Sequence, residues 1–596
     1  MVAKKLPVGI SDYKKLIDEN CYYIDKTMLV KEIMESGETI LITRPRRFGK
    51  TLNQSMLKYF FDVKGDTTYL FKDKKIWQEE EYRQMQGKYP VIYLSFKDVK
   101  KKNYSQSYEK MKKLIAEEYY RHRYLLSVIE GKSRREVYKK IMNREADSID
   151  YEDSLLKLSE YLFDYYKKKA IILIDEYDTP IMAAYNNGYY DEFIDFFKTF
   201  LSEALKDNRY LKKSVLTGIT RVAKESIFSD LNNLDVATVL SEFYNDKFGL
   251  TRKEVLEIIE DYNLEYEEEE IINWYNGYNF GGQEIYNPFS IINLVHNKGA
   301  LEEYWINSSG NQLIKDLIRT SSGEFKDGVL KLINGQEIEA EVERNLVFSD
   351  IDGREDNIWT LLLFSGYLKW VEQTQGRRYK LKLPNEEVRF FYRYTVQNIL
   401  KDKGVELENI IEELSLGHIK QFKNHFQELT TETLSYFDTK EKEPERFYHG
   451  LVLGMVVGLK NEYIITSNRE TGYGRADVVL IPRDNEKPGI IIEFKKYNLD
   501  ADKSLIDSAQ KALEQIENEG YEATIKSHGV DDIVKVGIAF KGKQVQIISN
   551  LDQEDSLTAE EEIAINLLNN GVDKEIIAET TGLSLEEIKQ LKSYQD

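Results

Sequence analysis

Four short hydrophobic runs in the first 225 residues constrain the fold of this chain more than any other feature. The runs are nearly continuous in Ile, Val and Leu, and longer amphipathic stretches separate them; they cover Thr39–Thr43, Val91–Phe96, Ile171–Asp175 and Val215–Thr220. Strands that are apolar on both faces and alternate with helices are typical of a parallel sheet covered by helices on both sides. The sequence therefore predicts an α/β domain over residues 1–225.

The remainder of the chain changes character twice. A length of 596 residues predicts about four domains, so further folding units are expected. Residues 226–300 are predicted to form a helical extension and 301–440 a helical middle region and linker. A second α/β pattern follows over 441–550, and 551–596 form a small acidic helical tail. The second pattern has helices over 445–460 and 502–519 and strands near 463–469, 475–482, 489–496 and 534–540.

Composition excludes several classes of site. A single cysteine, Cys21, excludes a disulfide framework and Cys-built metal centres, and six dispersed histidines disfavour a His-rich site. The longest apolar run, 451–459, is too short to span a bilayer. The start, Met1–Pro7, has no apolar stretch behind its lysines and so does not have the pattern of a signal peptide. We expect a soluble, cytoplasmic protein with no membrane partner. A net charge of −20 means that nucleic-acid contact must come from a local basic surface or from bridging metals.

The loop after the first strand has the layout of a phosphate-binding loop. Thr39–Thr43 leads into Arg44-Pro-Arg-Arg-Phe-Gly-Lys-Thr51 and then a helix-like stretch. Backbone N–H groups of Arg46, Arg47, Phe48 and Gly49 at the helix start would receive phosphates. Lys50 would reach the β- and γ-phosphates and Thr51 would ligate Mg²⁺. Arg44 replaces the first glycine of the general pattern, so a glycine at a helix start beside solvated cations is the alternative.

Two other strand ends carry polar residues that complete such a site. Ile171–Ile174 ends in Asp175 and Glu176, which would hold the Mg²⁺ shell and polarise the attacking water, respectively. Thr217 or Thr220, in the polar end of the strand Val215–Thr220, could sense the γ-phosphate. Arg221 could stabilise charge in cis or trans, or be a solvated arginine at a strand end.

A second constellation lies in the C-terminal α/β pattern. Asp477 lies in the expected strand near 475–482, and Glu493 lies sixteen residues on in the next strand, which also holds Lys495; the stretch between the two strands is turn-like. Glu493 and Lys495 share a strand face, and a suitable register would place Asp477 opposite. Two carboxylates and a lysine suit metal-dependent phosphodiester hydrolysis. Glu445, on the same helix face as His449, is a candidate additional metal ligand. Gln515 could contact the metal-bound water or the nucleic-acid backbone. The alternative for the whole group is that Asp477, Glu493 and Lys495 are solvated charges on a hairpin.

Several segments together resemble a known family. They are Leu6–Ile10, Tyr23–Thr27, Arg44–Thr51, Asp175–Asp178, Thr217–Arg221 and Tyr275–Pro288. These resemble the bacterial AAA-ATPase-like family, whose members carry a C-terminal domain of the PD-(D/E)XK nuclease superfamily. The resemblance implies a P-loop NTPase of the additional-strand, catalytic-glutamate (ASCE) type, and Arg44 matches this family's own version of the loop. His449–Gly450, Ser467–Glu470 and Gly472–Asp477 extend the resemblance to the C-terminal domain.

The tail is open to two interpretations. Residues 551–596 have the pattern of a helix-turn-helix around Gly582-Leu583-Ser584, but 12 acidic and 3 basic residues give the segment a net charge of −9. Phosphate would repel this charge, so a small packing or protein-interaction element is favoured. The aromatic stretch 274–289 is expected to pack in a core rather than stack on bases.

The sequence as a whole predicts an ATP-binding and ATP-hydrolysing module coupled to a Mg²⁺-dependent nuclease, with Mn²⁺ as a substitute metal. The substrate would be DNA or RNA. A second copy or a protein partner would bind through the helical middle or the tail. The alternative is a nucleotide-dependent switch or scaffold whose nuclease-like domain binds without cleaving, and a weaker one is an ATPase that acts on protein partners.

Overall fold

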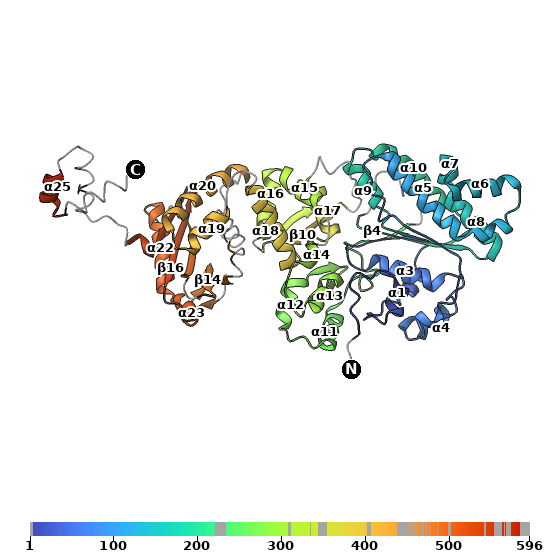
Figure 1. Cartoon of the computed structure of the whole chain (residues 1–596), viewed down its shortest axis with the longest axis horizontal. Helices are drawn as coiled ribbons and strands as arrows, with labels where there is room; N and C mark the ends of the chain where they lie inside the picture. The colour runs from blue at the N-terminus through green and yellow to red at the C-terminus, as the bar shows by residue number, and fades with distance from the viewer. Residues whose placement is uncertain are drawn as a thin grey trace. The chain divides into compact units, whose positions relative to one another are not determined.

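The computed structural model divides into two compact units, residues 1–393 and 394–596, which are described here one at a time (Figure 1). It describes residues 4–220, 234–307, 311–333, 335–343, 355–401, 407–437, most of 462–498, 502–541, 544–553 and parts of 563–584, with isolated positions between 452 and 459. Among these residues, no helix is both long and apolar enough to cross a bilayer.

The first unit is built on a five-stranded parallel sheet. Its strands are β1 (Thr39–Thr43), β2 (Val91–Ser95), β3 (Ala170–Asp175), β4 (Leu211–Gly218) and β5 (Leu234–Ala237), in the order β2-β3-β4-β1-β5. The four strands expected from the sequence are confirmed, with β4 displaced towards the N-terminus. β5 was not predicted because it has only four residues. The strand β4 lies between β1 and β3, which is the additional strand that the fold class requires.

Helices cover both faces of this sheet (Figure 1). On one side lie α1 (Tyr13–Asp18), α3 (Lys50–Phe61) and α4 (Glu80–Arg83). On the other lie α5 (Tyr104–Arg121), α6 (Lys132–Asn143), α7 (Ser148–Glu152), α8 (Ser154–Tyr166), α9 (Thr179–Asn186) and α10 (Tyr190–Leu205). The helix α10 buries Phe193, Phe196, Phe197 and Phe200. This i, i+3, i+4, i+7 spacing places four rings on one helix face, so the sequence fixes which face packs inward.

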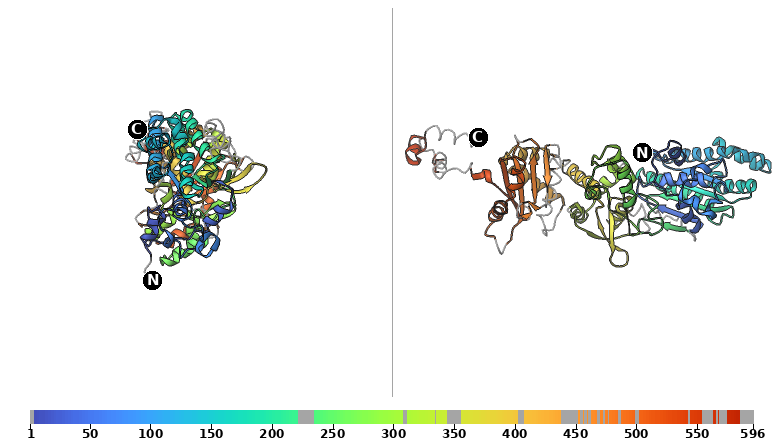
Figure 2. Two further views of the ribbon diagram at one scale, coloured as in Figure 1. Left: turned by 90° about the vertical axis from the view of Figure 1, so that its right-hand side faces the viewer. Right: turned by 90° about the horizontal axis from the view of Figure 1, so that it is seen from below.

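The middle region is mostly helical but also contains strands. Its helices are α11 (Arg252–Asp261), α12 (Glu268–Tyr275), α13 (Pro288–His296), α14 (Tyr304–Asn307), α15 (Gln312–Thr320), α16 (Gly323–Ile333) and α17 (Glu355–Ser365). A short hairpin joins β6 (Tyr278–Phe280) to β7 (Gln283–Ile285). The strands β8 (Ile338–Glu341), β9 (Lys369–Gln373) and β10 (Arg378–Lys382) form a three-stranded sheet in the order β8-β10-β9. The yellow hairpin of β9 and β10 projects from the unit (Figure 2).

The expectation of a helical middle region therefore needs a correction, because the region also contains a hairpin and a three-stranded sheet. The residues of β9 are half-buried or exposed, so the strand lacks the apolar period that reveals strands in a sequence. The aromatic stretch 274–289 packs in a core, as expected, because Tyr275, Tyr278, Phe280 and Tyr286 are buried.

The second unit contains a five-stranded mixed sheet in the order β11-β14-β15-β16-β17 (Figure 2). Its strands are β11 (Tyr463–Thr466), β14 (Val478–Pro482), β15 (Gly489–Lys496), β16 (Ile533–Lys541) and β17 (Gln544–Ser549), and only β15 and β16 are parallel. The strand β17 was not expected. The helix α22 (Leu505–Asn518) packs on β15 and β16 through Leu513 and Ile516. The expected helix 445–460 lies almost wholly outside the described residues.

Helices α19 (Leu407–Ser415) and α20 (Ile419–Phe437) also belong to the second unit. Tyr463 donates its hydroxyl hydrogen bond to the carbonyl of Ser415, and Lys423 pairs with Asp552 after β17. These two contacts attach the helices to opposite edges of the sheet, because β11 and β17 are its edge strands.

One helix runs from the first unit into the second. The division falls within α18 (Glu386–Lys401), between Arg393 and Tyr394. Near its start, Glu387 is fully buried and accepts hydrogen bonds from the backbone N–H of Trp305 and from Ser290 Oγ at 2.9 Å. Burial raises the pKa of Glu387 to about 8.

We expect Glu387→Gln to remove a pH dependence of stability. The carboxyl of Glu387 has a pKa of about 8 in the folded chain and about 4.3 when unfolded. Its neutral form therefore stabilises the fold at low pH, and this contribution decreases above pH 4 and disappears through pH 8. The parent should lose melting temperature between pH 6 and pH 9, and the Gln variant should lose less. Glu386→Gln, the neighbouring change of equal charge, should behave like the parent; equal slopes in all three proteins would contradict the prediction.

Candidate functional sites

The loop 44–50 closes around its own lysine. The helix α3 begins at Lys50 after Gly49, whose φ of 84° suits glycine. Lys50 is 4% exposed, and its Nζ donates to the carbonyl oxygens of Arg44 and Pro45, each at 2.9 Å. Burial lowers the pKa of this lysine, although three nearby carboxylates oppose the effect. The ammonium group thus sits at the start of α3, where the N-terminal end of the helix dipole favours anions.

Asp175 joins three elements at the carboxyl edge of the sheet. Its carboxylate accepts hydrogen bonds from Thr51 Oγ1 at 2.8 Å and Thr217 Oγ1 at 2.8 Å, and a longer one from Ser95 Oγ at 3.4 Å. Asp175 is fully buried, and this burial, reinforced by the adjacent charge of Glu176, raises the pKa of its carboxyl. A hydroxyl and a carboxylate oxygen this close fit a hard divalent cation, which would offset the cost of burying the charge.

Glu176 follows Asp175 in an unusual backbone conformation. Its φ is 55°, in the left-handed region that a residue with a Cβ seldom occupies. Thr179 Oγ1 donates a hydrogen bond of 3.0 Å to Glu176 Oε2, which holds the Glu176 side chain in place. The buried Asp178 fixes the same turn, because it accepts the backbone N–H groups of Ile219 at 2.7 Å and Thr220 at 2.9 Å. Such a conformation persists only where surrounding contacts enforce it, and it is typical of functional sites.

Arg44 does not face the phosphate-binding side of the loop. Its guanidinium is fully buried and donates to four carbonyl oxygens, those of Thr43 (2.9 Å), Ala237 (3.1 Å), Phe243 (3.0 Å) and Tyr244 (3.4 Å). It also lies 5.0 Å from the ring centroid of Phe280, and burial lowers its pKa to about 9. The residue that replaces the usual glycine therefore ties the loop to β5 and to the segment that follows it.

The other residues of the loop contact the middle region. The carbonyl of Arg46 accepts Trp305 Nε1–H at 3.1 Å, and the exposed Arg47 lies 4.9 Å from the ring centroid of Phe289. Phe48 is buried between Tyr278 and Phe280. The structure thus brings together Lys50, Thr51, Asp175, Glu176 and Thr217. It directs the side chains of Arg47 and Phe48 elsewhere, and Arg221 lies outside the described residues.

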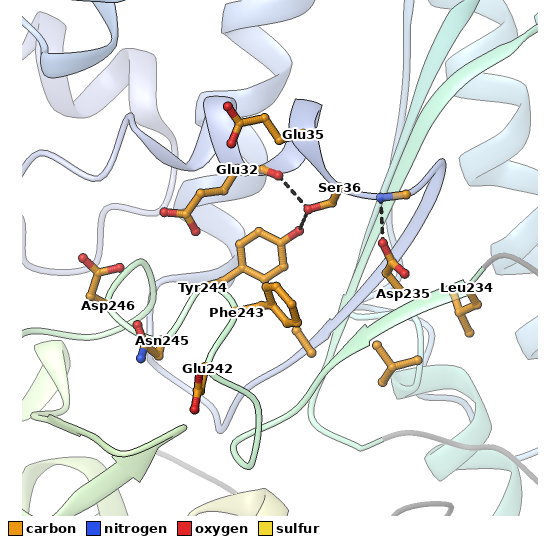
Figure 3. A pocket seen from close by; sticks show the side chains of 13 residues that line it. Glu32, Glu35, Ser36, Leu234, Asp235, Glu242, Phe243, Tyr244, Asn245 and Asp246 are labelled. Atoms are coloured by element: carbon orange, nitrogen blue, oxygen red, sulfur yellow. Dashed lines mark hydrogen bonds between the residues drawn. The ribbon is translucent and has the colours of Figure 1, made fainter.

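Two cavities lie near this loop. A small apolar cavity of about 100 Å³ opens beside Gly49 and Leu52, and Leu6, Pro7, Tyr22 and Ile24 contribute to its wall. Sequence reasoning missed these residues as a site, although the first pair and Ile24 lie in the segments that carry the family resemblance. A larger cavity of about 730 Å³ carries five carboxylates, from Glu32, Glu35, Asp235, Glu242 and Asp246 (Figure 3). These carboxylates would repel phosphate, so the larger cavity is not the phosphate site.

The second unit assembles the other predicted constellation. Val478 pairs with Ile492, so the same antiparallel register places Asp477 opposite Glu493. Asp477 Oδ2 accepts the backbone N–H of Phe494 at 2.9 Å, and Lys495 Nζ lies 3.3 Å from Glu493 Oε1. Gln515 on α22 donates to the same oxygen at 2.6 Å. Glu445 lies outside the described residues.

Glu493 is the most perturbed carboxyl of this cluster. It is 3% exposed, and burial together with the charge of Asp477 raises its pKa to about 7. In the described part of the chain, no three acidic, His or Cys residues form a metal-binding group. Two facing carboxylates still fit a Mg²⁺ ion, because Mg²⁺ in proteins is often held by one or two carboxylates and keeps several waters or phosphate oxygens.

Comparison with known families now identifies both regions. Residues 7–228 match the family described as "Predicted AAA-ATPase", and residues 443–550 match the PD-(D/E)XK nuclease superfamily. The N-terminal domain is AAA-ATPase-like, and the C-terminal domain belongs to the PD-(D/E)XK nuclease superfamily. Residues 557–593 match the C-terminal helix-turn-helix domain of the Rpn/YhgA-like nuclease family.

Individual relatives add little about function. An uncharacterised protein from the vnfD 5′ region of Azotobacter chroococcum mcd 1 is 24% identical over 566 residues, covering 91% of this chain and 97% of its own. Among solved structures, a signal-transduction ATPase with numerous domains and a tetratricopeptide-repeat sensor, from Pyrococcus horikoshii, matches 74% of this chain with 13% identity. The match spans 58% of that protein at a TM-score of 0.18, a value from which no structural conclusion follows.

The match at the tail favours the helix-turn-helix interpretation over a generic packing element. In the part of the tail that the structure describes, α25 (Lys574–Thr581) packs Ile577 against Ala564, next to Leu583. A helix-turn-helix fold does not remove the charge problem, because the net charge of −9 over 551–596 is unfavourable beside a phosphate backbone.

We expect the tail to be dispensable for nucleic-acid affinity. A chain that ends after Ser556 keeps Asp552, which pairs with Lys423, and loses the helix-turn-helix region. It should bind DNA and RNA as tightly as the full chain, because the removed segment cannot release counterions from phosphate. The measurement is fluorescence anisotropy at fixed salt, with a thermal melt as the folding control. A tenfold loss of affinity in a folded, equally assembled protein would show that the tail does bind nucleic acid.

Proposed function

We propose that the AAA-ATPase-like domain binds and hydrolyses ATP, and that its nucleotide state controls Mg²⁺-dependent phosphodiester cleavage of DNA or RNA by the PD-(D/E)XK domain. The observation that carries the ATPase assignment is the convergence of Lys50, Thr51, Asp175 and Glu176 at one sheet edge. The adjacent apolar cavity of about 100 Å³ would accept part of the adenine ring.

Each residue of the nucleotide site has a distinct role. The phosphates would replace the carbonyls of Arg44 and Pro45 as partners of the Lys50 ammonium. Thr51 and Asp175 would hold Mg²⁺, which neutralises charge on the β- and γ-phosphates when bound. Glu176, whose turn is fixed by Asp178 and Thr179, would orient the attacking water and accept its proton. Thr217, whose hydroxyl donates a hydrogen bond to Asp175, would sense whether the γ-phosphate is present.

Two hydrogen bonds support the proposal that the nucleotide state reaches α18. The carbonyl of Arg46 in the loop accepts a hydrogen bond from the Trp305 ring, and the backbone N–H of Trp305 donates to Glu387. Glu387 lies at the start of α18, which continues into the second unit. A change of loop conformation on binding phosphate would therefore act on α18 through Trp305.

In the nuclease centre, Asp477 and Glu493 would hold one or two Mg²⁺ ions. Bound Mg²⁺ activates a water and stabilises charge on the scissile phosphate. Lys495 and Gln515 both contact Glu493 Oε1, so they orient this carboxylate, and Lys495 would also stabilise the developing charge. Because the pKa of Glu493 is about 7 without metal, the cation must displace a proton below neutral pH, and metal affinity should increase as the pH rises.

For the ATPase, we expect Lys50→Ala to weaken ATP binding about 10- to 100-fold, because a buried charge-assisted contact to phosphate is lost. Glu176→Gln should bind ATP normally and lose about 100-fold or more in hydrolysis, because it acts on the water alone. Lys58→Ala removes the same charge two turns further along α3 and should behave like the parent. Unchanged ATP affinity in folded Lys50→Ala would exclude this loop as the nucleotide site.

For the nuclease, we expect Asp477→Asn to lose metal binding and cleavage, and Lys495→Ala to retain metal and lose about 100-fold or more in cleavage rate. Lys496→Ala and Asp531→Asn change the same charges at exposed positions and should cleave like the parent. The assay uses Mg²⁺ or Mn²⁺ on DNA and RNA, with and without ATP, and calorimetry measures metal binding.

Two outcomes would contradict the nuclease assignment. If both site variants cleave like the parent, the active centre lies elsewhere. If the parent cleaves neither DNA nor RNA under any of these conditions and binds no metal at Asp477, the domain binds without cleaving and the protein is a nucleotide-dependent switch.

A further inference from the structure

The end of the first unit that carries η3 (Arg123–Ser127) and α6 is strongly basic in an otherwise acidic protein. Residues 121–144 contain eight Lys and Arg against two Glu, a net charge of +6, whereas the whole chain has −20. Figure 1 shows α6 and α8 beside each other at this end of the unit. Six of the eight basic side chains are exposed: Arg123, Lys132, Arg135, Lys139, Lys140 and Arg144.

The packing of α6 explains why these charges point outward. Tyr138 and Ile141 are buried, and Tyr138 donates its hydroxyl hydrogen bond to the carbonyls of Tyr119 and His122, so this face of α6 packs on the end of α5. Lys139 and Lys140 are exposed, and in the described part of the chain no ion pair involves either lysine. Lys132 is 93% exposed and only 3.9 Å from Glu136, a separation that contributes little in water.

Exposed tyrosines lie among the cations. Tyr120, at the end of α5, is 56% exposed, and the guanidinium carbon of Arg123 lies 4.7 Å from its ring centroid. Tyr124 in η3 contacts both Lys64 and the 44% exposed Tyr165. The exposed residues Lys167, Lys168 and Lys169 follow directly. We call residues 120–144 with Lys64 and 165–169 the basic end.

We propose that the basic end binds single-stranded nucleic acid, with α6 lysines on the phosphates and Tyr120 stacked on a base. This rests on the proposed function, because it places the substrate of the PD-(D/E)XK domain on the AAA-ATPase-like domain. Alternating cations and exposed aromatic rings are typical of surfaces that bind single strands. The outer face of α6 carries charged and polar residues, so it lacks the apolar side chains with which an amphipathic helix enters a membrane.

The overall charge of the protein does not prevent this interaction. At physiological salt, charges more than about 8 Å apart are largely screened, so a strand on α6 responds to the local charge of the basic end. The acidic cavity of Figure 3 is formed by other segments, 32–37 and 234–246.

The test compares two triple variants of the full chain. Lys132→Gln, Lys139→Gln and Lys140→Gln remove three charges from the basic end. Lys253→Gln, Lys298→Gln and Lys331→Gln remove three exposed charges from the middle region. Anisotropy measures binding of a labelled 30-nucleotide single strand of DNA or RNA in EDTA without ATP, at several salt concentrations, so that cleavage cannot interfere.

We expect the basic-end variant to lose affinity at least tenfold at low salt, and the slope of log K against log salt to fall by about 2, or about 0.7 for each phosphate contact removed. The control variant should match the parent. Tyr120→Ala should weaken binding about fivefold or more through lost stacking, while Tyr120→Phe, which retains the ring, should not. Thermal melts verify that every variant is folded.

Several results would overturn the proposal. One is that the basic-end variant and the parent have equal affinity and equal salt slope. Another is that the control variant loses as much affinity as the basic-end variant. The third is that the parent binds polyglutamate or anionic vesicles as tightly as it binds the single strand. The outcome is independent of cleavage. Loss of binding in the basic-end variant supports the surface even if the parent never cleaves, and unchanged binding refutes it even if Asp477→Asn abolishes cleavage.

Discussion

A buried cation that pairs with no carboxylate among the described residues holds the loop 44–50 in place. Arg44 is fully buried, and four backbone carbonyls and the ring of Phe280 solvate it. An isolated charge in the interior is costly unless hydrogen bonds compensate it, and the two terminal nitrogens of Arg44 make all four of these bonds, whereas its Nε makes none with the described residues, so these carbonyls must stay in place. They come from the ends of β1 and β5 and from the segment after β5, and the ring comes from β6. One side chain therefore fixes the position of the P-loop relative to the sheet and the middle region.

Each of the two candidate sites is built around a buried carboxylate, in contrast to the buried cation of Arg44. Asp175 and Glu493 are buried carboxylates whose pKa values are raised, and each accepts hydrogen bonds from neutral side chains of other elements. A bound metal at either site would offset the desolvation cost that the fold imposes. The contacts of Thr51, Thr217, Lys495 and Gln515 keep the carboxylate oxygens oriented in the proposed sites.

The start of the helix α18 is tied to the loop 44–50 by two hydrogen bonds that pass through Trp305. The buried Glu387 anchors the first turn of α18 because its carboxylate accepts a hydrogen bond from the backbone N–H of Trp305. The ring N–H of Trp305 in turn donates a hydrogen bond to the carbonyl of Arg46 in the P-loop. Buried hydrogen-bonded groups have few alternative arrangements, so these contacts hold the loop and the first turn of α18 in a defined relation. Neither Glu387 nor Trp305 stands out in the sequence, because each lies in a stretch with no recognisable motif.

The sequence alone determined the sheet strands β1 to β4, β11 and β14 to β16, the P-loop, and the polar residues at the strand ends, because hydrophobic runs and turn chemistry are local properties. It also indicated that Asp477, Glu493 and Lys495 could converge, through the period of two along a strand. Only the tertiary structure decided the register that sets Asp477 opposite Glu493, the burial of Arg44 against β5 and the segment after it, and the unexpected strands β5, β8 to β10 and β17. Register, burial and pairing partners depend on residues far apart in the chain, and no local pattern records them.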